Sequence, residues 1–133
     1  ERAALVAPPA RRERLGEEQI FAARAAVLDV HLAPALERYI VELVLATRDA
    51  GRYDAQLARQ IAYGASPRGS IALERCARAH AWLAGRDFVT PADVHAVAVE
   101  VLRHRVLLAF EAEAEGTISD TLIERLLELV PLP

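Results

Sequence analysis

The spacing of its apolar residues is the feature that most constrains what this chain can fold into. Between residues 34 and 51, apolar side chains and one threonine recur at steps of three and four positions: Leu36, Tyr39, Ile40, Leu43, Val44 and Thr47. A helix with 3.6 residues per turn places such positions on one side. This stretch is therefore predicted to be an amphipathic helix whose stripe faces the core.

Two sequence signals mark the starts of further helices. Ser66 and Pro67 combine a capping residue with a proline suited to the first helical turn, and the helix is predicted to continue to about Gly85. Thr90 and Pro91 repeat the signal, and Asp93 is placed to return a capping hydrogen bond to Thr90. Both positions are predicted to begin core helices.

The residue content agrees with a helical fold. The chain of 133 residues holds 27 alanines and 18 leucines against six glycines and seven prolines, which favours helices over strands. The sequence predicts an all-α bundle of about five helices at residues 17–29, 34–51, 66–85, 90–105 and 119–130, with short extended segments near 86–89 and 106–110. Residues 51–63 have no clear pattern beyond a short helix around Leu57, and an acidic loop is expected before Ser119.

Two parts are expected along the chain. Residues 1–16 hold a proline pair and an arginine cluster (Arg11, Arg12 and Arg14), and they are interpreted as a linker or tail. Residues 17–133 are expected to form the domain. The sequence opens on Glu1 and contains no methionine, so we expect it to be a piece of a longer protein.

Composition excludes several classes of function. The 16 basic residues are all arginine, which removes chemistry that depends on lysine, including the P-loop lysine. Cys76 is the single cysteine, so no disulfide forms within the chain and a cytoplasmic location is expected. No apolar run is long enough to insert in a membrane. After residue 16 there are 12 basic and 17 acidic residues, which disfavours nucleic-acid binding.

Most polar candidates are interpreted as structural. No metal site is expected, because the four histidines are not at ligand spacing and there is no second cysteine. Cys76 is predicted to be an inert core residue on a small buried face with Ala72, Ala79 and Leu83, and Trp82 lies off that face. His95 is expected at a boundary or surface. The acidic residues Glu111, Glu113 and Glu115 are expected to be solvated rather than catalytic.

The segment GASPRGS, residues 64–70, carries the one chemical signal that remains. A helix start exposes backbone N–H groups and the positive end of the helix dipole, which together favour an anion. Arg68 adds a guanidinium fork suited to phosphate oxygens, and Gly69 is expected to keep the approach uncrowded. The residues alone leave two readings open, a phosphate contact and an ordinary exposed arginine.

An ordered set of motifs adds to this reading. They are YIVELVLATR at 39–48, GASPRGS, GRDFVTPADV at 85–94, VLRHRV at 101–106 and the closing VPLP. In this order they resemble the MoxR family of AAA+ ATPases, over residues 17–133, in the C-terminal helical lid that follows the ATPase core. The resemblance implies that Arg68 is the sensor 2 arginine, which reaches toward the γ-phosphate of ATP, with Ser66 and Pro67 as supporting residues of the helix start.

The resemblance also implies the cofactor and the partners. ATP with Mg²⁺ would be bound mainly by the ATPase core of the same protein, so the chain alone is expected to hydrolyse nothing. The parent protein would be a homo-hexamer with chaperone-like activity, and a protein with a von Willebrand factor A domain is an expected partner. Residues 49–63 depart from the family pattern, because this connection is longer than in many members.

Two other functions remain as alternatives. The first is a self-standing helical interaction module without a nucleotide role, which would use the surface around Trp82 or residues 49–63. The second is a helix-turn-helix DNA-binding domain, suggested by the helix start at Thr90 and opposed by the acidic charge of the domain.

Overall fold

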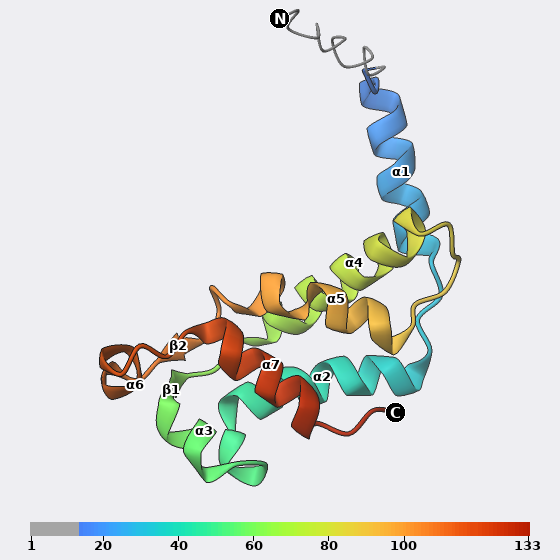
Figure 1. The fold of residues 1–133 in the computed structure, drawn as a ribbon. Coiled ribbons are helices and arrows are strands. Elements are labelled where there is room, and N and C mark those ends of the chain that lie inside the picture. The colour runs from blue at the N-terminus through green and yellow to red at the C-terminus, as the bar shows by residue number, and fades with distance from the viewer. Residues whose placement is uncertain (1–13) are drawn as a thin grey trace, which may run out of the picture.

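The computed structural model describes residues 14–133, and it consists mainly of helices (Figure 1). The five expected helices are present as α1 (Glu17–Asp29), α2 (Pro34–Arg48), α4 (Pro67–Leu83), α5 (Pro91–Leu102) and α7 (Ser119–Leu129). Short elements join them: a 3-10 turn η1 (Ala50–Arg52), α3 (Ala55–Gln60) and α6 (Phe110–Ala114). The all-α prediction is confirmed. The tail expected over residues 1–16 lies largely outside the described residues.

A small sheet accompanies the helices. Strand β1 (Ile61–Tyr63) pairs antiparallel with β2 (Leu107–Leu108), with Ile61 opposite Leu108. The prediction of an extended segment at 106–110 is therefore correct for Leu107 and Leu108. It is wrong at Phe110, which begins α6, and the acidic loop expected there contains this short helix. Near 86–89, Phe88 forms an isolated parallel bridge with His31.

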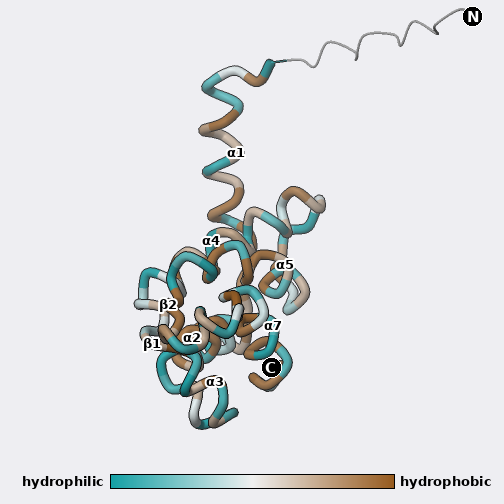
Figure 2. Tube along the Cα trace, turned by 60° about the vertical axis from the view of Figure 1, so that its left-hand side comes forward, coloured by the Kyte–Doolittle hydropathy of each residue, from teal (hydrophilic) through white to brown (hydrophobic). Residues whose placement is uncertain are grey.

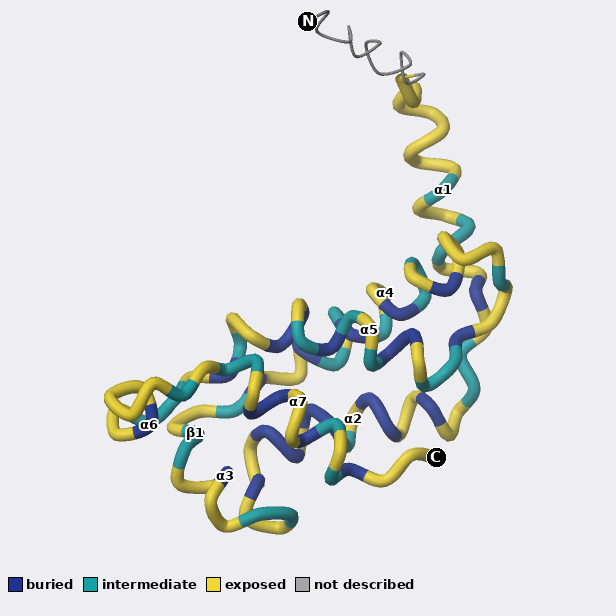
Figure 3. The backbone as a smooth tube through the Cα atoms, in the orientation of Figure 1, coloured by how far each residue is buried: buried dark blue, intermediate teal, exposed yellow. Residues whose placement is uncertain are grey.

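The core lies between four of the helices. All six residues of the stripe predicted for α2 are buried, from Leu36 to Thr47. In α5 the buried positions include Val94, Ala98 and Leu102, and in α7 they are Leu122, Ile123 and Leu126. Figure 3 shows these buried segments gathered where α2, α4, α5 and α7 meet. The three- and four-residue spacing thus identifies the core side of these three helices.

The buried face of α4 differs from the prediction. The residues that face the core are Gly69, Leu73, Ala77 and Ala81. Cys76 is exposed, and Leu83 is 78% exposed, so Cys76 is not a core residue. The two candidate faces of α4 consist almost wholly of small residues, and hydrophobicity therefore gives little contrast between them. The face that packs is set by α5, the main neighbour of α4.

Helix α1 projects from the rest of the domain (Figure 1). It has no buried residue, and among the helices it packs mainly against α4. Figure 2 shows apolar positions along this projecting helix, and Ile20, Phe21 and Leu28 are all exposed. The apolar residues of α1 therefore form a surface rather than a core stripe. No helix in the part of the chain described here is long and apolar enough to cross a membrane.

Candidate functional site

Arg68 lies on the first turn of α4, one residue after the leading Pro67. Its side chain is exposed, and within residues 14–133 it takes part in no hydrogen bond or ion pair. Pro67 has no backbone N–H, and the N–H of Gly69 already donates to the carbonyl of Ser66 at 2.7 Å. An approaching anion would therefore meet the guanidinium of Arg68 rather than several free backbone N–H groups.

Ser66 occupies the N-cap position with extended backbone angles, as the sequence predicts, but its side chain makes no capping hydrogen bond. The expectation that its hydroxyl caps the helix is therefore wrong. Pro67 holds the first helical position as expected. The contact that Ser66 does make with the first turn is through its backbone, whose carbonyl accepts a hydrogen bond from the N–H of Gly69.

Gly69 serves packing rather than access. It is buried, and a Cβ at this position would lie 3.3 Å from the Cβ of Ala65 and 3.6 Å from side-chain atoms of Val44 and Leu102. The absent side chain lets the first turn of α4 settle against α2 and α5. The expectation that Gly69 keeps an anion's approach uncrowded is corrected, because this residue faces the core.

The segment before α4 is attached to the end of α2. A Cβ on Gly64 would lie 2.4 Å from the backbone oxygen of Thr47, so the two backbones touch. The N–H of Ala65 donates to Oγ1 of Thr47 at 2.8 Å, and the Thr47 hydroxyl donates to the carbonyl of Val44 at 2.7 Å. Sequence reasoning missed this role of Thr47. The signal was a threonine inside an otherwise apolar stripe.

A buried carboxylate fixes the connection from α4 to α5. Asp93 is 1% exposed and accepts hydrogen bonds from Arg86 at 2.5 and 2.7 Å and from the N–H and hydroxyl of Thr90, both at 2.7 Å. His80 Nδ1 lies 2.7 Å from the same carboxylate. The hydrogen bonds from Arg86, then those from His80 and Thr90, hold the pKa of Asp93 well below its usual value despite its burial. The predicted capping hydrogen bond, which the N–H of Thr90 donates to the Asp93 carboxylate, is confirmed.

The remaining polar candidates have structural surroundings. His95 is half-buried, and its Nε2 lies 2.7 Å from the hydroxyl of the buried Tyr39, so it is a boundary residue as expected. Glu111, Glu113 and Glu115 are exposed. Residues 14–133 contain no group of three or more His, Cys, Asp or Glu side chains placed to hold a metal ion.

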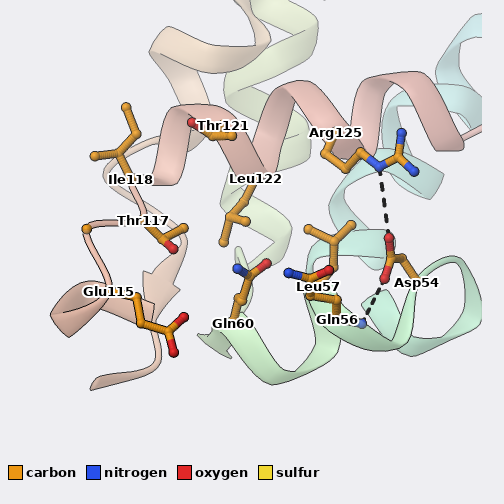
Figure 4. A pocket seen from close by; sticks show the side chains of 11 residues that line it. Asp54, Gln56, Leu57, Gln60, Glu115, Thr117, Ile118, Thr121, Leu122 and Arg125 are labelled. Carbon is orange, nitrogen blue, oxygen red and sulfur yellow. Dashed lines mark hydrogen bonds and ion pairs between the residues drawn. The ribbon is translucent and has the colours of Figure 1, made fainter. Parts of the chain in front are cut away.

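A polar pocket lies between α3, α7 and the loop that joins α6 to α7 (Figure 4). Its volume is about 430 Å³. Arg125 of α7 faces Asp54 across it with an Nε to Oδ2 distance of 3.9 Å, and Asp54 also accepts a hydrogen bond from the N–H of Gln56. Arg68, Ser66 and Pro67 do not line this pocket. The structure therefore separates it from the candidate phosphate contact.

An apolar groove of about 720 Å³ runs between α1 and the second half of α4. The exposed side chains in it include Ile20, Phe21 and Leu28 of α1 and Trp82 and Leu83 of α4. Sequence reasoning anticipated an exposed surface around Trp82. The sequence does not indicate the contribution of α1, because its apolar residues have the spacing of an ordinary helix of the bundle.

Comparisons with known proteins agree with this architecture. The family model described as the AAA lid domain matches residues 54–126. The chain is 34% identical over 129 residues to the chaperone MoxR1 of Mycobacterium tuberculosis, covering 96% of the chain and 34% of that protein. It is 41% identical over 110 residues to the protein MoxR of Paracoccus denitrificans, covering 77% of the chain and 32% of that protein.

A solved structure gives the same result. The crystal structure of a proposed ATPase from Cytophaga hutchinsonii superposes with a TM-score of 0.84 at 40% identity, covering 87% of the chain and 36% of that protein. The chain thus spans about a third of the length of each of these proteins. The chain belongs to the AAA lid domain family, and within it to the lids of MoxR-like ATPases.

Proposed function

We propose that the chain is the C-terminal lid of an ATP-hydrolysing protein and that Arg68 is its sensor 2 arginine, reaching the γ-phosphate of ATP bound in the ATPase core. One observation carries this proposal. Arg68 is exposed on the first turn of a core helix and has no partner within residues 14–133, while the backbone around it is attached to α2 and α5. A free cation on a fixed support is suited to meeting a phosphate.

The residues of the chain fit part of a nucleotide site. Arginine presents a permanently charged fork that matches phosphate oxygens, and Arg68 can supply it. The described residues offer no cluster of metal ligands. We therefore assign ATP and Mg²⁺ mainly to the ATPase core. The nucleotide, when bound, supplies the bond whose hydrolysis drives the movement of lid against core.

The lid would couple nucleotide state to work on other proteins. An arginine that contacts the γ-phosphate favours the closed arrangement of lid and core while ATP is bound, and it releases that arrangement after hydrolysis. The similarity to a protein named chaperone MoxR1 supports a chaperone-like activity of the parent protein. A homo-hexameric parent and a partner with a von Willebrand factor A domain are part of the same proposal.

The ATPase core of the same protein is the proposed occupant of the groove between α1 and α4. Exposed apolar side chains on both helices would lose contact with water in such a complex. A cytoplasmic location completes the proposal, and the single thiol at Cys76 is consistent with a reducing compartment.

The test is the Arg68→Ala substitution in the full-length parent protein. Removing the guanidinium is expected to lower ATP turnover about 10- to 100-fold, because the developing charge on the transferred phosphate loses a partner. Arg38→Ala is the matched control, since Arg38 is an exposed arginine of α2. Equal turnover of the Arg68 variant and the wild type would contradict the sensor assignment.

A self-standing interaction module is the second candidate, and the groove between α1 and α4 is the observation that favours it. This function predicts that Arg68→Ala leaves every activity unchanged. It also predicts that polar substitutions in the groove, such as Phe21→Ser and Leu83→Ser, abolish partner binding without an effect on ATP turnover.

A further inference from the structure

Thr47 is a buried polar residue in an apolar stripe, and its environment shows what its hydroxyl does. The side chain is 1% exposed. A buried hydroxyl is costly unless it is hydrogen-bonded. Its donor is satisfied within α2 by the carbonyl of Val44, as is common for helical threonine. Its acceptor is used outside the helix, by the N–H of Ala65. This second bond connects segments 18 positions apart.

Three contacts around this bond determine where α4 begins. Ala65 is fully buried and directly precedes the N-cap Ser66. Gly64 rests against the backbone of Thr47 with no room for a Cβ, and Gly69 rests on Ala65 and Val44. The first turn of α4 therefore cannot shift along α2 without breaking the hydrogen bond between Ala65 and Thr47.

We propose that Thr47 is a positioning residue for Arg68. The inference rests on the proposed function, in which Arg68 reaches the γ-phosphate of ATP. Arg68 has no partner within residues 14–133 to hold its guanidinium, so its location depends on the backbone of the first turn of α4. Thr47 is the side chain that ties this backbone to α2. Small misplacements of a group that binds the transition state reduce rates strongly.

The experiment compares Thr47→Val with Thr47→Ser in the full-length parent protein. Valine has nearly the shape of threonine but no hydroxyl, whereas serine keeps the hydroxyl. We expect Thr47→Val to lower kcat for ATP hydrolysis about tenfold and Thr47→Ser to retain most of it. If Thr47→Val does not fold, Thr47→Ala and Thr47→Ser give the same comparison of side chains without and with the hydroxyl.

Tyr39→Phe is the matched control. It removes a hydroxyl from the same helix, but this hydroxyl lies 2.7 Å from His95 Nε2 of α5, whereas that of Thr47 bonds to the segment before α4. A general loss of stability would affect the Tyr39 and Thr47 variants alike. We expect Tyr39→Phe to leave kcat at the wild-type value.

A double-mutant comparison separates positioning from a merely structural role. In an Arg68→Ala background, Thr47→Val is expected to cause no further loss of turnover, because the group that it positions is gone. An equal loss with and without Arg68, or wild-type turnover of Thr47→Val beside an impaired Arg68→Ala, would overturn the inference. Wild-type turnover of Arg68→Ala would overturn the proposed function itself and the inference with it.

Discussion

The hydroxyl of Thr47, near the end of α2, accepts a hydrogen bond of 2.8 Å from the backbone N–H of Ala65, just before α4 begins. Thr47→Val leaves this buried N–H without a partner. We expect the free energy of unfolding of the chain to fall by about 2 kcal/mol. Urea unfolding measures the change, and Thr47→Ser serves as the control that keeps the bond. A Thr47→Val variant as stable as the wild type would mean that the bond contributes nothing.

Gly64→Ala tests the backbone contact between the same two segments. The new Cβ would lie 2.4 Å from the backbone oxygen of Thr47, and backbone atoms cannot move aside without displacing α2 or α4. We expect a loss of more than about 2 kcal/mol in the free energy of unfolding. Gly51→Ala is the control, since its Cβ would meet the Ala58 Cβ at an ordinary 3.5 Å. Similar losses for both variants would contradict this reading of Gly64.

Arg68 and Arg78 lie on the same helix but differ in their contacts. Arg78 donates to Glu74 at 2.9 Å and to the carbonyl of Val30, which joins α4 to the end of α1. Arg68 has no such partner among residues 14–133. Thermal unfolding is expected to show that Arg78→Ala destabilises the chain by about 1 to 2 kcal/mol, whereas Arg68→Ala changes stability by less than about 0.5 kcal/mol. A large destabilisation by Arg68→Ala would show that Arg68 stabilises the fold, which would contradict this prediction.

The Asp93 carboxylate makes the free energy of unfolding of the chain depend on pH in the acidic range. Because its folded-state pKa lies below the ordinary value of 3.8, the carboxylate contributes stability above about pH 4. That contribution is lost as the pH falls toward the folded-state pKa. Asp93→Asn is expected to lower the free energy of unfolding by about 3 kcal/mol at pH 7 and to flatten its decline below pH 4. Urea unfolding from pH 3 to pH 7 tests this, and parallel curves for variant and wild type would contradict it.

Cys76 provides a test of the face of α4 that packs. Its side chain is exposed, although Ala72 and Ala79 lie on the same side of the helix. A thiol reagent is expected to modify the native chain at a rate within about tenfold of that for the urea-unfolded chain. Modification that occurs only after unfolding would show that Cys76 is buried in the native chain.

The sequence predicts most of the fold where the contrast between polar and apolar positions is strong. The buried residues from Leu36 to Thr47 in α2 and from Leu122 to Leu126 in α7 are large and recur at steps of three and four, so the helical period appears directly. In α4 the contrast is weak, because each of the two candidate faces has a single leucine among small residues. The correct face is determined by contact with α5, and single-sequence spacing does not contain that information.

Short elements and tertiary contacts account for the other differences. Strand β1 has three residues and pairs with β2, more than 40 positions later, which no local pattern indicates. The sequence indicates Arg68 through its place at a helix start and through a family resemblance. Thr47 and Gly64 became visible only when α2 and the start of α4 were placed together, since their roles depend on a contact between distant segments.

Helix α4 joins two features that are distant from one another. Its first turn carries Arg68, and its last turns carry Trp82 and Leu83 in the groove beside α1. These positions are roughly 21 Å apart along a continuous helix that rises about 1.5 Å per residue. A helix is stiff over this length. The groove and Arg68 therefore lie at opposite ends of one helix, so any rigid-body displacement of α4 moves Arg68 and one wall of the groove together.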